Sequence, residues 1–140
     1  MKCYIASPFF NNLQLEEVEQ IKKILEELSI DYYSPKDFFI LKPEASIEEQ
    51  NKVVDSNIQE ILNCDFMICN TNNKDMGSIF ESGYAYCKNI PIIYFNSQFP
   101  KFNVMLARSG VFCCNTFKQL RQSIINFCNN YSQNYEGLIE

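Results

Sequence analysis

The chain has 140 residues, of which 46% are hydrophobic, and its formal net charge is −5. This length suits one domain with one hydrophobic core, so we predict a single domain over residues 1–140. The acidic balance and the lack of any Lys or Arg run argue against a nucleic acid polymer as partner, because phosphate binding needs clustered positive charge. No apolar stretch approaches the roughly 20 residues that span a membrane, so we expect no membrane association.

Histidine is absent from the chain, whereas cysteine occurs seven times. The missing histidine excludes Ser–His–Asp and Cys–His catalysis and argues against a zinc site. The odd cysteine count, without CxxC spacing or a secretory signal, indicates buried, reduced thiols in a cytoplasmic protein. Any nucleophile, acid or base must therefore come from carboxylates, tyrosines, cysteines or lysines.

Short apolar runs alternate with longer segments of 3.6-residue period, a pattern typical of a parallel α/β sheet. In chain order we expect strand Met1–Ala6, helix Leu13–Leu28, strand Asp31–Ser34, loop Lys36–Ala45, a helix from Ser46 to about Asn63, strand Cys64–Cys69, loop Asn70–Met76, helix Gly77–Lys88, strand Pro91–Phe95, a loop or short helix at Phe99–Ser109, strand Val111–Cys114 and helix Thr116–Tyr131. The predicted fold class is α/β: a doubly wound, flavodoxin- or Rossmann-like five-stranded parallel sheet flanked by helices.

The first two helices carry clear local signals. Leu13–Leu28 places its apolar side chains on one face and Glu and Lys on the other, as expected for a helix that covers a sheet. Ser46, followed three residues later by Glu49, predicts a capping box at the start of the second helix.

Ligands of doubly wound sheets bind at the carboxyl ends of the strands. The most polar of the loops expected there, Asn70–Gly77, runs directly into the third helix. Asp75 begins that helix, where the dipole favours a carboxylate, and Glu81 follows in an apolar context. Glu81 is either a desolvated nucleophile aimed at the strand ends or a surface residue, and Asp75 is either a ligand contact or a stabilising helix-end carboxylate. Gly83 is expected to let the helix approach the sheet closely.

The array Asp-x-Gly-x-x-x-Glu-x-Gly-Tyr-Ala at Asp75–Ala85 resembles the signature of nucleoside 2-deoxyribosyltransferases. Four other segments are similar to that family, in the same order along the chain: the opening Tyr4–Phe10, Asn57 with Cys64-Asp65, Asn103-Val104-Met105, and the ending Tyr135–Glu140. Five matches in register span the whole chain, which makes the resemblance specific.

The resemblance implies a reaction that transfers 2-deoxyribose between nucleobases. Glu81 would attack the anomeric carbon and form a covalent glycosyl-enzyme intermediate, which a second base then resolves. Asp75 would bind the 5'- or 3'-hydroxyl of the sugar, and Tyr4 would hold Glu81 in position. This chemistry needs no metal and no other cofactor.

The substrates implied by the resemblance are deoxyribonucleosides and free nucleobases, in nucleotide salvage. The residues expected to bind them are Ser7, Phe10, Asp37, Phe39, Asn57, Gly77, Asn103 and Met105. In the family, a neighbouring subunit lends the segment at Asn103 and Met105, and the carboxyl-terminal tail folds back toward the nucleophile. The resemblance therefore implies a homo-oligomer, commonly a hexamer built from dimers.

One departure from the family pattern concerns the base. Family members often carry Asp where this chain has Asn57, and an amide cannot protonate a leaving base, which leaves Asp37 or a bound water as the proton donor. Where some family members read the base with a glutamine of the second loop, this chain has Asp37-Phe38-Phe39, which supplies rings for stacking and one carboxylate. Two other functions stay open: an N-glycosidase of nucleosides or nucleoside 5'-monophosphates, and a non-catalytic nucleotide-binding module. The first loop has no Gly or Arg to hold a phosphate, which favours nucleosides over nucleotides.

Overall fold

The computed structural model describes all residues from Met1 to Glu140 and contains one five-stranded sheet. Its elements are β1 (Lys2–Ala6), α1 (Asn12–Glu27), β2 (Asp31–Tyr33), a 3-10 turn (Pro35–Asp37), α2 (Ile47–Leu62), β3 (Phe66–Asn70), a second 3-10 turn (Asn72–Lys74), α3 (Met76–Cys87), β4 (Ile92–Phe95), α4 (Val104–Ser109), β5 (Phe112–Cys114) and α5 (Phe117–Cys128). The predicted sequence of elements is confirmed: strand and helix boundaries shift by at most three residues, and the segment Phe99–Ser109 contains the short helix α4 from Val104.

The strand order is β2-β1-β3-β4-β5, and all four pairings are parallel. The chain first runs outward from β1 to β2 and then returns to place β3 on the other side of β1. The switch point therefore lies between β1 and β3, which is where ligands of such sheets bind. The predicted doubly wound α/β class is confirmed.

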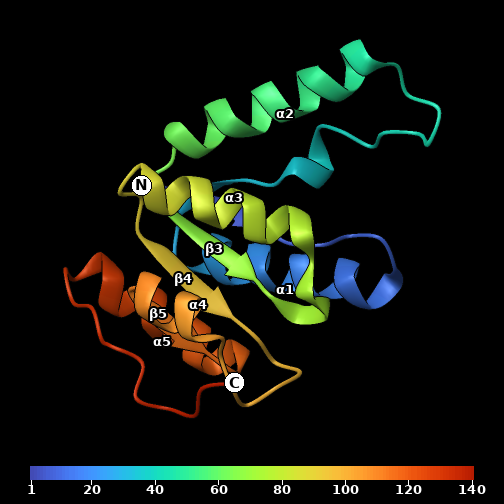
Figure 1. Ribbon diagram of the computed structural model, residues 1–140. Helices are drawn as coiled ribbons and strands as arrows, with labels where there is room; N and C mark the ends of the chain where they lie inside the picture. The colour runs from blue at the N-terminus through green and yellow to red at the C-terminus, as the bar shows by residue number, and fades with distance from the viewer.

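Helices cover both faces of the sheet (Figure 1). On one face, α1 and α5 bury Ile21, Leu25, Leu120 and Ile124 against alternate strand residues. On the other face, α2, α3 and α4 pack against the remaining strand residues, and α3 lies between α2 and α4 (Figure 1). Because both faces are covered, the central strand β3 is buried along its whole length.

Local capping explains where the helices begin. Ser46 and Glu49 form both hydrogen bonds of the predicted capping box on α2. Asp75 accepts a hydrogen bond from the Ser78 N–H at the start of α3, which fixes the helical phase that positions Glu81. The final helix ends at Cys128, three residues before the predicted Tyr131, because Asn130 adopts a positive φ that stops the helix.

The cysteines only partly match the prediction. All seven are free, and Cys3, Cys64, Cys69 and Cys114 are buried. Cys87 and Cys128 are exposed, contrary to the expectation of buried thiols, because each lies in the last turn of a helix. None of the helices combines the length and the apolar composition that a membrane crossing requires.

Candidate active site

Three elements bring polar side chains together around Glu81. The Tyr4 hydroxyl, from β1, donates a hydrogen bond of 2.8 Å to Glu81 Oε1. The Asn57 side-chain amide, from α2, donates a longer one of 3.4 Å to the same oxygen. The sequence-predicted nucleophile therefore points inward, toward β1 and α2, and is not an unattached surface carboxylate.

Burial dominates the electrostatics of Glu81. It raises the pKa of Glu81 from the ordinary 4.5 to about 7, and the negative charge of Asp75 adds to the rise. The hydrogen bonds from Tyr4 and Asn57 act in the opposite direction and lower that pKa. No Lys or Arg forms an ion pair with Glu81. The result is a desolvated carboxylate without a counter-ion, which is the state that suits a nucleophile.

Two aromatic residues extend this site, and the sequence reasoning missed one of them, Tyr33. The ring of Tyr33, from β2, stacks on Tyr4 with centroids 5.6 Å apart, and its hydroxyl donates to Asn57 Oδ1 at 3.5 Å. Phe38 stacks on Tyr33 at 4.7 Å with an interplanar angle of 10°. Register could have revealed Tyr33, because Tyr4 and Tyr33 are direct partners on neighbouring strands.

Asp75 lies at the amino end of α3, as predicted. Its Oδ2 accepts hydrogen bonds of 2.8 Å from both the backbone N–H and the hydroxyl of Ser78. Gly77 is exposed, and a Cβ added there would lie 3.4 Å from Asp75 Oδ2. The helix-capping role expected of Asp75 is thus present, while its Oδ1 forms no hydrogen bond within the chain.

The first loop holds the other two predicted binding residues of this edge. The Ser7 hydroxyl accepts a hydrogen bond of 3.0 Å from the Asn70 side-chain amide and donates to the Pro8 carbonyl. Phe10 is 75% exposed and stacks on Phe9 with centroids 5.0 Å apart. Ser7 is therefore used to hold the loop, whereas Phe10 remains accessible.

A buried carboxylate on α1 joins the loops that surround the strand ends. Glu17 accepts hydrogen bonds of 2.8 and 2.9 Å from the side-chain amides of Asn70 and Asn72. Asn72 also bonds Ser97 through both its amide nitrogen and its oxygen. The loops after β1, β3 and β4 are fastened to one another through this network, which sequence periodicity could not reveal because each member looks like an ordinary polar residue.

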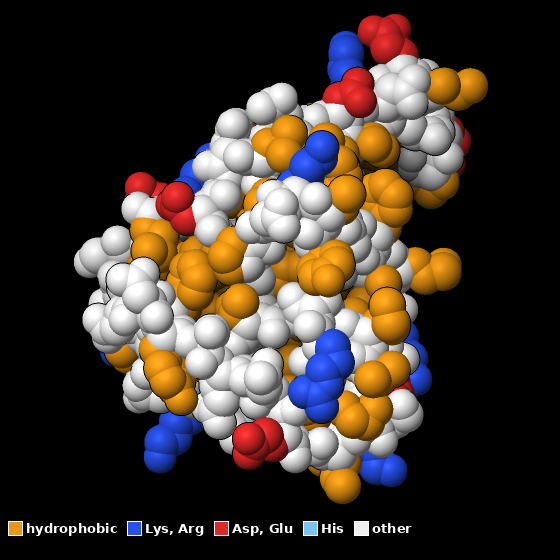
Figure 2. All heavy atoms as spheres, turned by 60° about the vertical axis from the view of Figure 1, so that its left-hand side comes forward, with side chains coloured by type: hydrophobic (Ala, Val, Ile, Leu, Met, Phe, Trp, Pro, Cys, Tyr) orange, Lys and Arg blue, Asp and Glu red, His pale blue; other side chains and the backbone are white.

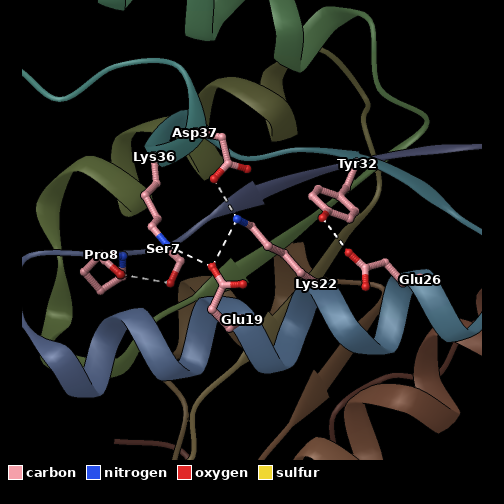
Figure 3. Close-up of polar contacts among 8 residues, drawn as sticks. All are labelled: Ser7, Pro8, Glu19, Lys22, Glu26, Tyr32, Lys36 and Asp37. Atoms are coloured by element: carbon pink, nitrogen blue, oxygen red, sulfur yellow. Dashed lines mark hydrogen bonds and ion pairs between the residues drawn. The ribbon is translucent and has the colours of Figure 1, made fainter.

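The second loop places Asp37 and Phe39 differently from each other. The Asp37 carboxylate accepts a 2.7 Å hydrogen bond from the Lys22 ammonium group, which also contacts Glu19 (Figure 3). Phe39 is partly buried and takes part in no aromatic stacking. Asp37 is therefore held as an ion-paired carboxylate, and Phe38 is the ring of this loop that stacks next to Tyr33.

Asn103 and Met105 lie apart from Glu81 in the single chain. The Asn103 side chain caps α4, and Met105 is 74% exposed. Both line a cavity of about 370 Å³ that Ile79 of α3 also lines, and Glu81 does not. Residues 79 and 81 point to nearly opposite sides of an α-helix, so α3 separates this cavity from the Glu81 site.

The carboxyl-terminal tail returns to the same side of α3 as that cavity. Ile139 pairs with Phe102 as an isolated bridge, and Tyr135 packs against Phe102. The Glu140 carboxylate lies 3.5 Å from the Lys74 ammonium, one residue before Asp75. Within one chain the tail thus reaches the start of α3 without reaching Glu81.

Gly83 does not face the sheet, contrary to the prediction. A Cβ added there would meet nothing within 4 Å, so the residue lies on the outer surface of α3. The physical reason is helical phase, because Ser82 and Ala85 are the buried neighbours that contact the strands. No three His, Cys, Asp or Glu side chains converge as a set of metal ligands, and the cofactor-free reaction stays a prediction.

Solved structures share this fold over nearly the whole chain. The 2-deoxyribosyltransferase of Bacillus psychrosaccharolyticus superposes with a TM-score of 0.85 at 23% identity, covering 96% of this chain and 99% of that one. A conserved protein from Enterococcus faecalis V583 gives 0.76 at 16% identity, covering 91% and 98%. A CMP N-glycosidase of Clostridium botulinum gives 0.64 at 15% identity, covering 89% and 99%.

No curated protein sequence matches the chain significantly. The family model of nucleoside 2-deoxyribosyltransferases matches residues 3–129, which include every element from β1 to α5. The chain therefore belongs to the nucleoside 2-deoxyribosyltransferase family.

Proposed function

We propose that this enzyme transfers 2-deoxyribose between nucleobases and that Glu81 is its nucleophile. The observation that carries the proposal is the partly buried Glu81 carboxylate, which Tyr4 orients at 2.8 Å and no cation neutralises. We place the enzyme in the cytoplasm, in nucleoside salvage; its seven free cysteines are typical of a reducing compartment.

The reaction proceeds through two displacements at the anomeric carbon. A Glu81 oxygen forms a bond to that carbon while the bond to the base breaks, and the bonding electrons leave with the base, which takes up a proton. A second base then attacks the same carbon from the opposite side, loses the proton of its attacking nitrogen to water, and releases the carboxylate. Two inversions give net retention, as in retaining glycosidases.

Asp75 binds the sugar in this proposal. Its Oδ2 is occupied by Ser78, and its Oδ1, free of partners in the chain, accepts a hydrogen bond from a sugar hydroxyl. Holding the sugar at a second point fixes the anomeric carbon for in-line attack by Glu81.

Water supplies the proton for the departing base. The Asn57 amide has no acidic proton to give, although it can hydrogen-bond the base. The other candidate, the carboxylate of Asp37, is engaged in an ion pair with Lys22 at 2.7 Å.

The working enzyme is proposed to be a homo-oligomer built from dimers, in which a neighbour supplies Asn103 and Met105. Two features support this arrangement. In one chain these residues lie beyond α3 from Glu81, and α3 and α4 expose large apolar side chains, among them Met76 at 85% and Phe80 at 65%. Figure 2 shows hydrophobic side chains spread across the middle of one face of the molecule, with most charged side chains toward its edges. Such exposed apolar surface is typical of a contact with another chain.

The experiment is base exchange. Incubating the protein with a deoxynucleoside and a second free base should yield the exchanged nucleoside, and mass spectrometry should detect a deoxyribosyl ester on the peptide that contains Glu81. Release of free base at the same rate with and without an acceptor would instead indicate an N-glycosidase, the activity named for the Clostridium botulinum structure of similar fold. Binding of nucleoside without any turnover would indicate a binding module.

A further inference from the structure

Three consecutive side chains of the second loop differ in their contacts and burial. Asp37 turns toward α1 and Lys22, Phe38 turns onto Tyr33, and Phe39 is partly buried. This loop follows β2, the edge strand whose Tyr33 pairs with Tyr4 of β1. Its contribution to substrate recognition therefore depends on which of these side chains faces the site around Glu81.

Asp37 forms an ion pair with the buried Lys22 (Figure 3). Lys22 is only 7% exposed, and its ammonium group contacts the carboxylates of both Asp37, at 2.7 Å, and Glu19, at 3.2 Å. Burial alone would lower the pKa of Lys22, but the hydrogen bonds to Asp37 and Glu19 outweigh it and raise that pKa. The ion pair thus fixes one end of the loop, next to Phe38.

Phe38 ends a row of three stacked rings. Phe38 and Tyr33 are nearly parallel at 4.7 Å, and Tyr33 and Tyr4 follow at 5.6 Å. The hydroxyl groups of the two tyrosines point to Asn57 and Glu81, so the row borders the site where the sugar meets its base. The Phe38 ring is 63% exposed, which leaves much of it without a protein partner.

Building on the proposed function, we propose that Phe38 contacts the base of the bound nucleoside and that the Lys22–Asp37 ion pair positions Phe38 for this contact. On this loop a base meets the Phe38 ring, because Phe38 and Phe39 have no polar side-chain atoms and Asp37 Oδ1 bonds Lys22. Aromatic contact is tolerant of base identity, since every base has a π-face. The loop therefore accepts purines and pyrimidines alike.

The first test compares nucleoside binding to variants that do not turn it over. In a Glu81→Gln background, deoxyadenosine and thymidine are titrated against the Phe38→Ala variant by calorimetry. Loss of an aromatic contact weakens binding about tenfold, and we expect a similar factor for both nucleosides. Ile40→Ala, which removes an 81% exposed apolar side chain from the same loop, is the matched control and should leave both affinities unchanged.

The ion pair is tested by its effect on Michaelis constants. Lys22→Met should raise KM for every acceptor base while leaving kcat nearly unchanged, because only contact with the base is loosened. Lys22→Arg keeps the positive charge and should restore KM. A uniform fall in kcat, or no rescue by Arg, would show that Lys22 serves only the general stability of the fold.

Two results would overturn the role of Phe38: unchanged affinities in Phe38→Ala, or a loss confined to the purine or to the pyrimidine nucleoside. Absence of nucleoside binding in the Glu81→Gln background would also count against it. These results differ from a failure of the proposed function. A protein that binds nucleosides through Phe38 but exchanges no bases would contradict only the transferase assignment, not the role of Phe38.

Discussion

The two sides of α3 differ in how far the side chains on each side are held by contacts within the same chain. On the α2 side, Glu81 is held by Tyr4 and Asn57, and every contact comes from the same chain. On the α4 side, Asn103, Met105 and Glu140 surround an open cavity of about 370 Å³, next to exposed apolar residues. One chain thus brings Tyr4 and Asn57 to Glu81 by itself, whereas Asn103 and Met105, under the proposed function, would reach Glu81 only from a second copy.

The largest expected effect comes from a substitution on the α2 side of α3, at Glu81. Glu81→Gln keeps the size of the side chain and removes the nucleophile, so base exchange should fall by at least about 10³-fold. Chromatography of the exchange products measures this loss, and circular dichroism confirms that the variant is folded. If the variant keeps about a tenth or more of the activity, Glu81 is not the nucleophile.

The same variant should be more stable at high pH. The pKa of Glu81 is raised to about 7 in the folded protein, so the folded state favours the protonated form. The stability contributed by that form is complete below pH 4.5 and is lost as the pH rises through about 7. A neutral Gln should therefore raise the free energy of unfolding at pH 8 by up to about 3 kcal/mol and leave it nearly unchanged at pH 4.

Urea unfolding of both proteins at the two pH values provides the measurement. Equal stabilities at pH 8 would mean that the Glu81 carboxylate is better solvated than its position between α3 and β1 indicates.

The α4 side is tested by complementation between chains. Asn103→Ala should lower activity about tenfold, the usual effect of losing a hydrogen bond to the substrate. Mixing and reassembling it with inactive Glu81→Gln should create sites that combine an intact Glu81 with an intact Asn103 from the neighbour. With random pairing in a two-fold dimer, about a quarter of all sites are intact. Activity of the mixture no greater than the average of the separate variants would contradict the shared site.

The smallest expected effect concerns the Tyr4 hydrogen bond. Glu81 must be ionised to attack, so kcat/KM should rise with pH and level off above about 7. Tyr4→Phe removes a hydrogen bond that lowers the pKa of Glu81, so the rise should move to higher pH by less than about one unit. A pH–rate profile of each protein makes the comparison, and a shift toward lower pH would contradict the assigned role of Tyr4.

The sequence predicted the residues at the start of α3 better than the surroundings of Glu81 on β2 and the second loop. Polar spacing and the resemblance at Asp75–Ala85 located Glu81 and its neighbour Asp75, because both depend on local helix geometry. Tyr33 was missed since its stacking on Tyr4 depends on strand register. Asp37 stays a predicted substrate-binding residue, but its ion pair could not be predicted, because Lys22 lies 15 residues away and no local pattern shows that pairing.

The fold was more predictable than the site because it follows from periodicity and capping. The alternation of apolar strands and amphipathic helices determined the parallel sheet, and Ser46 with Glu49 determined the start of α2. The predicted orientation of Gly83 was wrong, because a shift of one position changes which side of a helix meets the sheet.

The buried Glu17 has a consequence for how the protein moves. Through Asn70 and Asn72 it joins loops from three strands into one cooperative unit, whose amide protons should exchange only in larger opening events. The stretch at 39–45 is outside this unit and forms few backbone hydrogen bonds. We expect hydrogen exchange to be fast there and slow at 70–73, so a departing base would pass by the second loop while the sugar stays held at the rigid edge.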